Sequence, residues 1–386
     1  MGRVRKLGRA LQDRFCMSNI GILALATPDH GGTFQYTLSM IEALLCLPEH
    51  RYTLYTLPDN RAFDRFHLPI VALPSPFAVL GGAARSNRAL FREVDKVIAP
   101  IYSTYLLLSP RPFAFTLHDL QERHYPENFS IAQRLWRRTV NGALARRAAR
   151  IVCETGYVKD DIVRFCGVPA KKVVVVPTCP VTTQMQEELP AQRLDEVCAK
   201  LQLPDQFVFY PAQFWPHKNH LRLVEAFAEV ARHHPQCHLL LTGKPRGEFR
   251  RVCARVIELG LEKKVRHVGY VSTSELNAIY KTCTLVVVPT LFESISLPVY
   301  EAFALGAPVC ASRIGALPEQ IGEAGVLFDP FSVQEIALTI CAALADEDRR
   351  RELVRRGKAA VAGLTREAYA ARLRSILTEV APHGVM

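Results

Sequence analysis

The fold is decided by Leu285-Val286-Val287-Val288-Pro289 and by Phe292-Glu293-Ser294-Ile295-Ser296-Leu297-Pro298-Val299-Tyr300-Glu301-Ala302. The first part is an unbroken apolar run that ends at a proline, which predicts a fully buried strand. Pro298 suits the first turn of a following helix, and Gly306 suits the end of that helix. The stretch therefore predicts a strand, a short polar loop and a helix, the repeating unit of a parallel sheet covered by helices.

Two carboxylates flank this loop. Glu293 lies in the loop and Glu301 lies one turn into the helix. The backbone amides of residues 294–297 are expected to point outward at the helix N-terminus, where a phosphate group is favoured. Carboxylates beside a phosphate suit a ligand that also brings neutral hydroxyl groups, and a nucleoside diphosphate sugar brings both. The alternative is a surface carboxylate at position 293 and a charge at position 301 that the helix dipole favours.

Strands and helices alternate along the chain, and the pattern restarts near residue 206. The expected strands are 19–26, 51–57, 113–117, 151–153 and 173–176, then 207–210, 238–241, 265–268, 285–288 and 308–311. This alternation predicts an α/β protein with two Rossmann-like, doubly wound parallel-sheet domains. The expected domains are 1–185 and 206–364, joined by a proline-rich, polar linker at 186–205. Ligands are expected at the carboxyl ends of the strands, in a cleft between the domains.

Composition excludes several classes of protein. A chain of 386 residues with 49% hydrophobic and 22% charged residues is expected to be globular, with more than one core. Its apolar runs are far shorter than the ~20 residues of a membrane span, and its basic start is not followed by the apolar segment of a secretory signal. The 11 cysteines are odd in number and scattered, which favours a reducing cytoplasm and no structural zinc.

The positive charge lies almost wholly in the first half. Residues 1–180 hold 24 Lys and Arg against 14 Asp and Glu, a balance of +10 out of a net charge of +11. Such an asymmetry suggests an anionic partner, namely a membrane surface, a phosphate-bearing acceptor or nucleic acid. In the basic stretch 134–150, Arg134, Arg137 and Arg138 are expected on one helical face, and Trp136, Val140 and Leu144 on another. A docked helix with a solvated basic side and a helix in contact with a membrane both fit this pattern.

The residues around the two glutamates resemble those of the retaining glycosyltransferases of family 4, which have the GT-B fold. The chain keeps Glu293, Leu297, Pro298 and Glu301, and it continues in register through Ala304-Leu305-Gly306-Ala307-Pro308-Val309. It departs from the family at Ser294-Ile295-Ser296, where glycines are usual. The resemblance implies that the last helix, about 365–386, crosses back to complete the first domain.

The resemblance also implies an activity. The expected enzyme is a hexosyltransferase that moves a mannose- or glucose-type sugar from a GDP- or UDP-linked donor to an acceptor hydroxyl, with retention of configuration. The acceptor is expected in cell-surface polysaccharide or glycolipid assembly and can be linked to a lipid diphosphate. The expected location is cytoplasmic, as a peripheral protein at the inner face of the cytoplasmic membrane, without a cofactor and without nucleic acid as a partner. The alternatives are a nucleotide-sugar epimerase or phosphorylase on the same fold, and a nonenzymatic binder of anionic lipid or nucleic acid.

Lys218 follows the first expected strand of the second domain. A lysine there can neutralise a departing diphosphate, and the resemblance implies that Lys218 and Asn219 bind the donor diphosphate. An arginine usual in the family is replaced by Gln213, so that one positive charge is missing or comes from elsewhere. Without the resemblance, Lys218-Asn219 starts a helix with the asparagine as its cap.

Other expected site residues follow strands of the first domain. Gly31 and Gly32 join the first strand to the first helix and allow a ligand to approach the backbone. The resemblance implies that they bind the donor, near its phosphate and the acceptor. The resemblance implies that His118 faces the transferred sugar or the acceptor, and that Asp119 orients the His118 ring or takes a proton from the acceptor. Thr155 fits a hydroxyl position of the family, although a helix N-cap explains it equally well.

The remaining expectations concern the donor and a metal. The expected catalytic residues are His118, Lys218 and Glu293. The donor contacts are completed by Ser294, Ile295, Ser296, Leu297 and Glu301, and the resemblance places Tyr270 and Val271 near the nucleobase. The acidic run Asp346-Glu347-Asp348 lies in a charged helical segment and does not follow a buried strand, so it predicts a solvated helix turn and no metal site.

Overall fold

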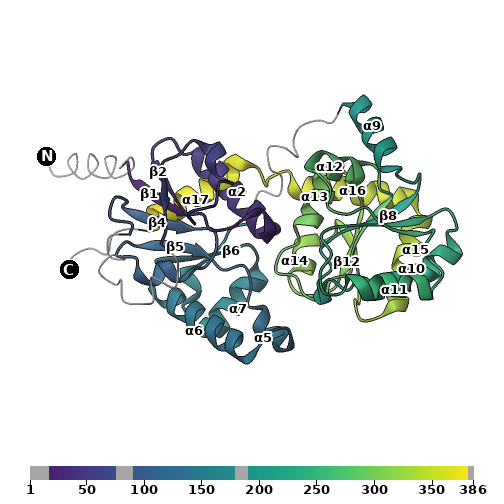
Figure 1. Cartoon of the computed structure of the whole chain (residues 1–386), viewed down its shortest axis with the longest axis horizontal. Helices are drawn as coiled ribbons and strands as arrows, with labels where there is room; N and C mark the ends of the chain where they lie inside the picture. The colour runs from purple at the N-terminus through teal and green to yellow at the C-terminus, as the bar shows by residue number, and fades with distance from the viewer. Residues whose placement is uncertain (1–16, 75–89, 179–189, 381–386) are drawn as a thin grey trace. The chain divides into compact units, whose positions relative to one another are not determined.

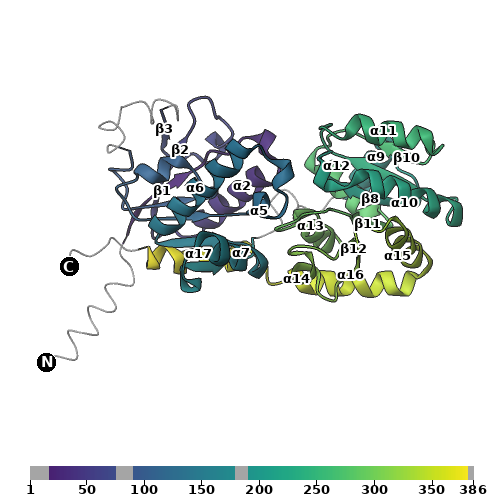
Figure 2. The same ribbon diagram turned by 90° about the horizontal axis from the view of Figure 1, so that it is seen from below.

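The computed structural model describes residues 17–74, 90–178 and 190–380. These residues form two compact units (Figures 1 and 2). Of the described residues, unit 1 comprises 17–74, 90–178 and 366–380, and unit 2 comprises 190–365. None of the described helices is long and apolar enough to cross a membrane.

Unit 1 is built on a seven-stranded sheet in which the paired strands are parallel. Its strands are β1 (Asn19–Leu23), β2 (Arg51–Thr56), β3 (Ile70–Ala72), β4 (Lys96–Ala99), β5 (Phe113–Thr116), β6 (Arg150–Cys153) and β7 (Val173–Val175). They lie in the order β3-β2-β1-β4-β5-β6-β7, so the strand order reverses between β1 and β4. Such a reversal opens a crevice at the carboxyl ends of the two central strands.

Helices cover both faces of this sheet (Figure 1). Because successive side chains of a strand point to opposite faces, Ile20 and Ile22 pack with α2 (Gly32–Leu45) and α17 (Arg366–Glu379), while Leu23 packs on the other side. That other side is covered by α6 (Ile131–Arg147) and α7 (Gly156–Cys166). The last helix therefore contributes buried side chains to the core of unit 1. The shorter helices are η2 (Pro28–His30), η3 (Asp64–Phe66), η4 (Thr104–Leu108), α5 (Gln121–His124), η5 (Pro126–Asn128) and η6 (Ala170–Lys172).

Unit 2 repeats the plan with a six-stranded parallel sheet in the order β10-β9-β8-β11-β12-β13. Its strands are β8 (Phe207–Pro211), β9 (His238–Thr242), β10 (Val265–His267), β11 (Leu285–Val288), β12 (Val309–Ser312) and β13 (Gly325–Phe328). Its helices are α9 (Ala191–Leu201), η7 (Pro216–Lys218), α10 (His220–His233), α11 (Phe249–Glu258), α12 (Thr273–Thr282), α13 (Leu297–Leu305), α14 (Leu317–Ile321), α15 (Val333–Ala345) and α16 (Glu347–Val361). In Figure 1, α12 and α13 lie on one face of the sheet, and α10 and α11 on the other. The strand order reverses between β8 and β11.

The predicted α/β class, parallel sheets and ten strands are confirmed, with ends that differ by at most three residues. Three further strands, β3, β4 and β13, were not predicted. The stretch 186–205, expected to be a linker, contains α9, and Leu201 and Leu203 next to it pack against the core of unit 2. The predicted helix ends around Pro298 and Gly306 are confirmed, because Pro298 lies in the first turn of α13 and Gly306 ends it in the left-handed conformation.

Candidate functional site

Lys218 is placed by a tight turn between β8 and α10. The turn is the single 3-10 helix η7, which starts at Pro216 and ends at Lys218. The next residue, Asn219, has a φ of 60°, a left-handed conformation that asparagine tolerates better than most residues. The hydroxyl of Tyr210, at the end of β8, donates a hydrogen bond to the Lys218 carbonyl at 3.0 Å. Lys218 is therefore fixed at the carboxyl end of a central strand.

Asn219 holds three segments of unit 2 together. Its side chain is buried, and its Nδ2 donates to the carbonyls of Pro289 and Pro330 at 2.8 and 2.9 Å. Its Oδ1 accepts from Arg222 at 3.0 Å. Asn219 is the N-cap residue of α10, as the alternative expected, and its carbonyl accepts from the Leu223 amide at 3.3 Å, but its side chain makes no capping bond. Its contact with a donor stays a prediction.

The backbone of Glu293 is clamped from both sides. On one side, the amide of Leu291 donates to the carbonyl of His217 at 2.7 Å, which joins this loop to η7. On the other side, the amide of Ala316 donates to the Glu293 carbonyl at 3.0 Å. Gly315 permits this approach, because its φ is 57° and an added Cβ would lie 2.4 Å from the same carbonyl oxygen.

The structure brings Lys218 and Glu293 into direct contact. Lys218 Nζ donates to Glu293 Oε2 at 2.7 Å. The two residues follow β8 and β11, the neighbouring strands between which the strand order reverses, so their loops meet at the carboxyl ends of these strands, where doubly wound sheets bind their ligands. Both side chains are partly exposed, 22% for Lys218 and 12% for Glu293. An ion pair with this access to solvent can exchange its partner for groups of a ligand.

The middle of the loop differs from expectation at Ser296. This residue is buried, its amide donates to Gln320 Oε1 at 2.9 Å, and Gln320 Nε2 donates to its carbonyl at 2.6 Å. The expectation that all amides of residues 294–297 point outward is therefore wrong for Ser296, because a glutamine side chain of α14 occupies that amide. Ile295 packs its side chain against the core of unit 2, and Leu297 begins α13.

Glu301 lies on α13 and accepts a hydrogen bond of 2.7 Å from the hydroxyl of Tyr280 on α12. Burial raises the pKa of Glu301 to about 7, and the hydrogen bond from Tyr280 offsets only part of that rise. Burial, together with the neighbouring charge of Glu301, raises the pKa of Tyr280 well above its usual value. The Glu301 carboxyl group is therefore expected to gain or lose its proton near neutral pH.

A positive charge lies beside Gln213. Arg246 Nε donates to Gln213 Oε1 at 3.2 Å, and the Arg246 guanidinium lies 5.4 Å from the centre of the Trp215 ring. Arg246 belongs to the loop after β9, where Gly243 has a φ of 120° and an added Cβ would lie 2.4 Å from the Ala212 carbonyl oxygen. Arg246 was not predicted as a site residue. Its contact with Gln213 depends on the packing of the loops after β8 and β9, and no local sequence pattern indicates that packing.

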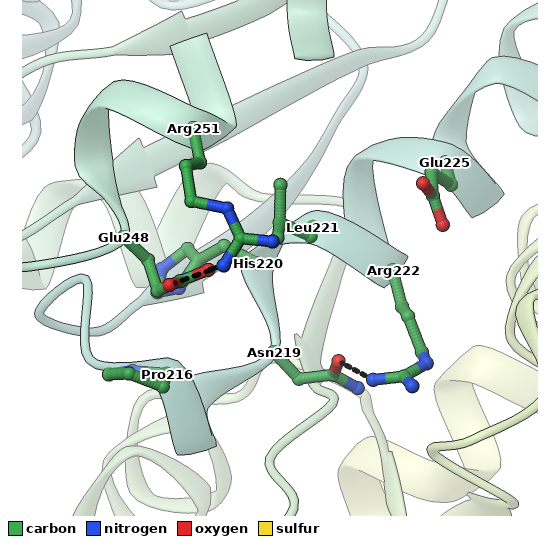
Figure 3. A pocket seen from close by; sticks show the side chains of 8 residues that line it. All are labelled: Pro216, Asn219, His220, Leu221, Arg222, Glu225, Glu248 and Arg251. Atoms are coloured by element: carbon green, nitrogen blue, oxygen red, sulfur yellow. Dashed lines mark hydrogen bonds and ion pairs between the residues drawn. The ribbon is translucent and has the colours of Figure 1, made fainter. Parts of the chain in front are cut away.

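A pocket of about 380 Å³ adjoins η7 and the start of α10 (Figure 3). Its charged lining residues are engaged within the protein. Arg222 donates to Asn219, Arg251 pairs with Glu248, and Glu225 pairs with Arg255. The pocket shares Pro216 and Asn219 with the turn that carries Lys218.

Two residues predicted near a nucleobase follow β10. Tyr270 is exposed, and Lys244 Nζ lies 5.4 Å from the centre of its ring. Val271 is partly buried and packs against the core of unit 2. Tyr270 thus offers a flat, solvent-facing ring beside a cation, next to a residue anchored in the core.

In unit 1, Gly31 and Gly32 form the turn between η2 and α2. Gly31 has a φ of 56° and its carbonyl accepts the first helical hydrogen bonds of α2, from Phe34 at 3.0 Å and Gln35 at 3.1 Å. Gly32 is the first residue of α2, one position earlier than predicted. The turn lies at the carboxyl end of β1, one of the two strands between which the order reverses in this sheet.

His118 is held by Glu154, a residue that was not among the predicted site residues. Its Nδ1 donates a short hydrogen bond to Glu154 Oε1, and its Nε2 donates to the Pro100 carbonyl at 3.0 Å. The Tyr36 ring packs edge-on against the imidazole, with ring centres 4.6 Å apart. Burial alone lowers the pKa of His118, but the charge of Glu154 and its hydrogen bond more than offset this, and the pKa is raised. Both ring nitrogens of His118 are thus engaged within unit 1, and the raised pKa favours the protonated ring.

Asp119 does not orient the His118 ring, and that expectation is wrong. Its Oδ1 accepts from the Gln121 amide at 3.0 Å and from Arg137 at 2.8 Å. The ring partner is Glu154, because β5 and β6 are neighbours in the sheet and their carboxyl ends lie side by side. Thr155 is the N-cap of α7 and accepts from the Val158 amide at 3.3 Å. Its contact with an acceptor stays a prediction.

Within the described residues, no group of three or more His, Cys, Asp or Glu side chains is arranged to hold a metal ion. The acidic run at 346–348 begins α16, where Asp346 accepts from the Arg349 amide at 2.8 Å and Asp348 pairs with Arg351. These contacts support its interpretation as a solvated helix turn.

Two family models match the chain, one in each unit. Residues 198–360 match "Glycosyl transferases group 1", and residues 30–182 match "Glycosyltransferase Family 4". The first match contains Lys218 and Glu293, and the second contains His118 and Glu154.

Curated relatives include two mannosyltransferases of Escherichia coli. The serotype-specific mannosyltransferase WbdA is 30% identical over 218 residues, which is 55% of this chain and 25% of WbdA. The O-antigen chain mannosyltransferase B is 27% identical over 287 residues, covering 67% of this chain and 75% of the relative. The chain thus matches about a quarter of the length of WbdA.

Solved structures share the fold across nearly the whole chain. Anabaena Alr3699/HepE, in complex with UDP and glucose, superposes with a TM-score of 0.77 at 19% identity and covers 94% of this chain and 99% of its own. At this level of identity the likeness establishes the fold, which is GT-B with its two Rossmann-like domains.

Proposed function

This chain belongs to the family 4 glycosyltransferases, and from that premise we propose that it transfers a hexose from a nucleoside diphosphate sugar to an acceptor hydroxyl with retention of configuration. The observation that carries the proposal is the contact of 2.7 Å between Lys218 and Glu293, on the loops that follow β8 and β11 in unit 2. In this contact, Lys218 provides a positive charge that can bind a diphosphate, and Glu293 provides a carboxylate that can accept hydrogen bonds from sugar hydroxyls.

The proposed reaction follows from the charges that develop. As the bond between the sugar C1 and the diphosphate oxygen breaks, negative charge grows on the diphosphate and Lys218 stabilises it. The acceptor oxygen forms the new bond to C1 on the same face, and its proton goes to the departing phosphate oxygen. Glu293 accepts hydrogen bonds from the sugar hydroxyls and holds the ring in place. No protein nucleophile takes part in this scheme.

The donor is proposed to be GDP- or UDP-linked. HepE has been solved with UDP and glucose bound, and the E. coli relatives are mannosyltransferases, which supports a glucose- or mannose-type sugar. Arg246, positioned by Gln213, supplies a second cation near the diphosphate. Glu301 accepts from the ribose hydroxyls, and Tyr270 with Val271 lies against the base. Ser294, Ile295 and Leu297, with the neighbouring Ser296 and Asn219, complete the donor contacts.

The acceptor is proposed to bind unit 1. His118 lies at the carboxyl end of β5 and its raised pKa favours a positive charge, which suits an anionic group, with Asp119 and Thr155 supporting it. Gly31 and Gly32, at the carboxyl end of β1, are proposed to lie near the donor phosphate as well as the acceptor. The excess of +10 charges in residues 1–180 favours a lipid-diphosphate acceptor at the inner face of the cytoplasmic membrane. A role in polysaccharide or glycolipid assembly follows from such an acceptor.

The first experiment is a thermal-shift screen of GDP- and UDP-sugars, because a ligand that binds the native state raises the apparent stability. The donor that it identifies is then incubated with a short-chain polyprenyl diphosphate-linked sugar. Release of nucleoside diphosphate and a product with the donor's anomeric configuration, read by the proton coupling at C1, are the expected results.

Two outcomes would replace the proposal. Release of a free epimer without any acceptor identifies an epimerase on this fold. A salt-sensitive complex with vesicles or RNA, without sugar transfer from any donor of the screen, identifies a nonenzymatic binder.

A further inference from the structure

The first two turns of α6 present large apolar side chains to solvent. Ile131 is 75% exposed, Leu135 is 63% exposed and Trp136 is 49% exposed. Ile131 and Leu135 are four residues apart and share one side of the helix, and Trp136 lies next to them. In Figure 1, α6 lies on the lower side of the sheet of unit 1, beside α5 and α7. We call the surface formed by Ile131, Leu135, Trp136, Arg134 and Arg138 the Trp136 face.

Arginines border these apolar side chains. Arg134 and Arg138 lie three and seven residues after Ile131, at the edge of the same side of the helix. The whole of α6 contains five arginines and no acidic residue. Arg137 is not part of this border, because it pairs with Asp119 and Glu122, each at 2.8 Å. The expected sharing of one solvated face by Arg134, Arg137 and Arg138 is thus wrong for Arg137.

The Trp136 face is held firmly in place. Ser130 caps α6 by accepting from the Gln133 amide at 3.2 Å, and the Gln133 side chain accepts from the Ser130 amide at 2.8 Å. Further along the helix, Val140 and Leu144 are buried in the core. Trp136, expected to share their stripe, instead packs at the surface with its ring centre 6.2 Å from that of Tyr102. Large apolar side chains gathered on one exposed side of a rigid helix mark a candidate interaction surface.

We propose that the Trp136 face docks the protein on an anionic phospholipid bilayer, with Ile131, Leu135 and Trp136 in the headgroup region and Arg134 and Arg138 on lipid phosphates. This proposal rests on the proposed function, because an enzyme whose acceptor is linked to a membrane lipid needs a surface that binds the membrane. Apolar side chains bordered by arginines suit this boundary, where the aliphatic stems lie among acyl chains and the guanidinium groups reach the phosphates. Tryptophan favours the same boundary.

Charge favours lipid over a second copy of the chain as the occupant. In a symmetric dimer, the Trp136 face would meet itself, and Arg134 and Arg138 of both copies would be brought together without any acidic residue of α6 to offset them. An anionic bilayer supplies the missing negative charge.

The chain provides its own reporter for a test. It contains two tryptophans, so Trp215→Phe leaves Trp136 as the single tryptophan of the full-length protein. With phosphatidylglycerol-phosphatidylcholine vesicles, the Trp136 emission is expected to shift to the blue and to be quenched by brominated acyl chains, and to be unchanged with phosphatidylcholine alone. An emission unchanged by anionic vesicles, or a blue shift that follows protein concentration without lipid, overturns the proposal.

Variants then locate the contact. Ile131→Ser with Leu135→Ser is expected to lower partitioning onto anionic vesicles at least about tenfold, since each removes apolar area from the interface. Arg134→Gln with Arg138→Gln is expected to lower partitioning onto anionic vesicles at low salt. The matched control is Ile257→Ser with Leu338→Ser in unit 2, whose side chains are 63% and 61% exposed, and this variant is expected to bind as the parent does. Equal binding by all variants overturns the proposal.

A separate assay distinguishes this proposal from the proposed function. Release of nucleoside diphosphate from the donor is measured without vesicles for the parent and for the Ile131→Ser, Leu135→Ser variant. Equal release by both, together with the loss of vesicle binding in the variant, supports docking alone as the role of this surface. Binding of vesicles through the Trp136 face by a protein that transfers no sugar from any donor overturns the proposed function and leaves the docking surface intact.

Discussion

Each unit has an ion pair at the carboxyl ends of its strands, and the two pairs differ in how easily their partners can separate and bind other groups. In unit 2, Lys218 and Glu293 lie on loops and both side chains reach solvent. In unit 1, the Glu154 side chain has no exposed surface, and both nitrogens of His118 are engaged. Separating the first pair returns both charges to water or to a ligand. Separating the second leaves a carboxylate buried without a partner, which is far more costly.

This difference assigns the pairs different roles. Under the proposed function, Lys218 and Glu293 are expected to separate when a diphosphate and a sugar arrive, so that the pair satisfies both charges only while no donor is bound. His118 and Glu154 are expected to keep their contact throughout, so that Glu154 positions the His118 ring and favours its charged form.

The largest expected effect is that of Glu293→Ala. If Glu293 holds the sugar as proposed, loss of its carboxylate is expected to lower the rate of transfer at least about 100-fold, since removing one such contact in other active sites has effects of that order. Thermal unfolding is expected to change little, because the side chain is partly exposed. The matched control is Glu262→Ala, an exposed glutamate of the same unit. Full transfer activity in folded Glu293→Ala would falsify the assignment of the site.

Lys218→Met is expected to weaken binding of the nucleoside diphosphate product about tenfold to 100-fold, because a charge-assisted contact to phosphate is lost. Glu293→Ala is expected to bind the same diphosphate at least as tightly as the parent, because Lys218 no longer has to leave a carboxylate. Isothermal titration with the diphosphate and with the uncharged nucleoside makes the comparison, and the nucleoside is expected to show no difference. Lys263→Met, at an exposed position, serves as control. Weakening by both variants would mean that the pair acts as one unit and is not exchanged.

Glu154→Gln tests the fixed pair. The His118 pKa, followed by NMR, is expected to fall when the carboxylate charge is removed, and the transfer rate to fall about tenfold through misplacement of the ring. Because the folded-state pKa of His118 is raised, the pair stabilises the protein fully below pH 6.5, and that contribution is lost as the pH rises through the folded value. The difference in unfolding temperature between parent and variant is therefore expected to be largest in acid. Glu127→Gln, exposed in unit 1, is the control, and an unchanged His118 titration in Glu154→Gln would rule out the role of Glu154.

The sequence predicted the local elements that carry Lys218 and Glu293, but it did not predict the contact between them. The strand, loop and helix from Leu285 to Gly306 were predictable because each signal is local: an apolar run, a proline in the first turn and a glycine at the end. Lys218 and Glu293 were found separately as residues that follow buried strands. Their direct contact was not predicted, because it depends on β8 and β11 being neighbours in the sheet.

Contacts over long separations account for the rest. Glu154 lies 36 positions from His118, and its only signal in the sequence is a carboxylate directly after the apolar run 151–153. Gln320 takes the amide of Ser296 from 24 positions away, and Arg246 reaches Gln213 across 33. Each of these contacts follows from the packing of loops at the strand ends, which local periodicity does not encode.

The smallest expected effect concerns Glu301, which belongs to neither pair and has a hydroxyl as its partner. Its pKa is raised from 4.5 to about 7, so the unfolded chain releases this proton at lower pH than the folded protein does. Stability therefore falls as the pH rises from about 4.5 to 7, by at most about 3 kcal/mol. Glu301→Gln cannot titrate, so the unfolding temperature of the parent relative to this variant is expected to drop by a few degrees between pH 5 and pH 8.

The same measurement with a bound donor tests whether Glu301 contacts the ribose. Ribose hydroxyls that donate to Glu301 favour its charged form, so a saturating donor is expected to shift the pH-dependent drop in the parent to lower pH. Glu262→Gln, which alters an exposed carboxylate, is expected to follow the parent at every pH. If the donor leaves the drop at the same pH, Glu301 does not touch the ribose, and its raised pKa reflects only burial beside Tyr280. Glu301 would then differ from Glu293 in kind, as a carboxylate that supports α13 and does not hold a ligand.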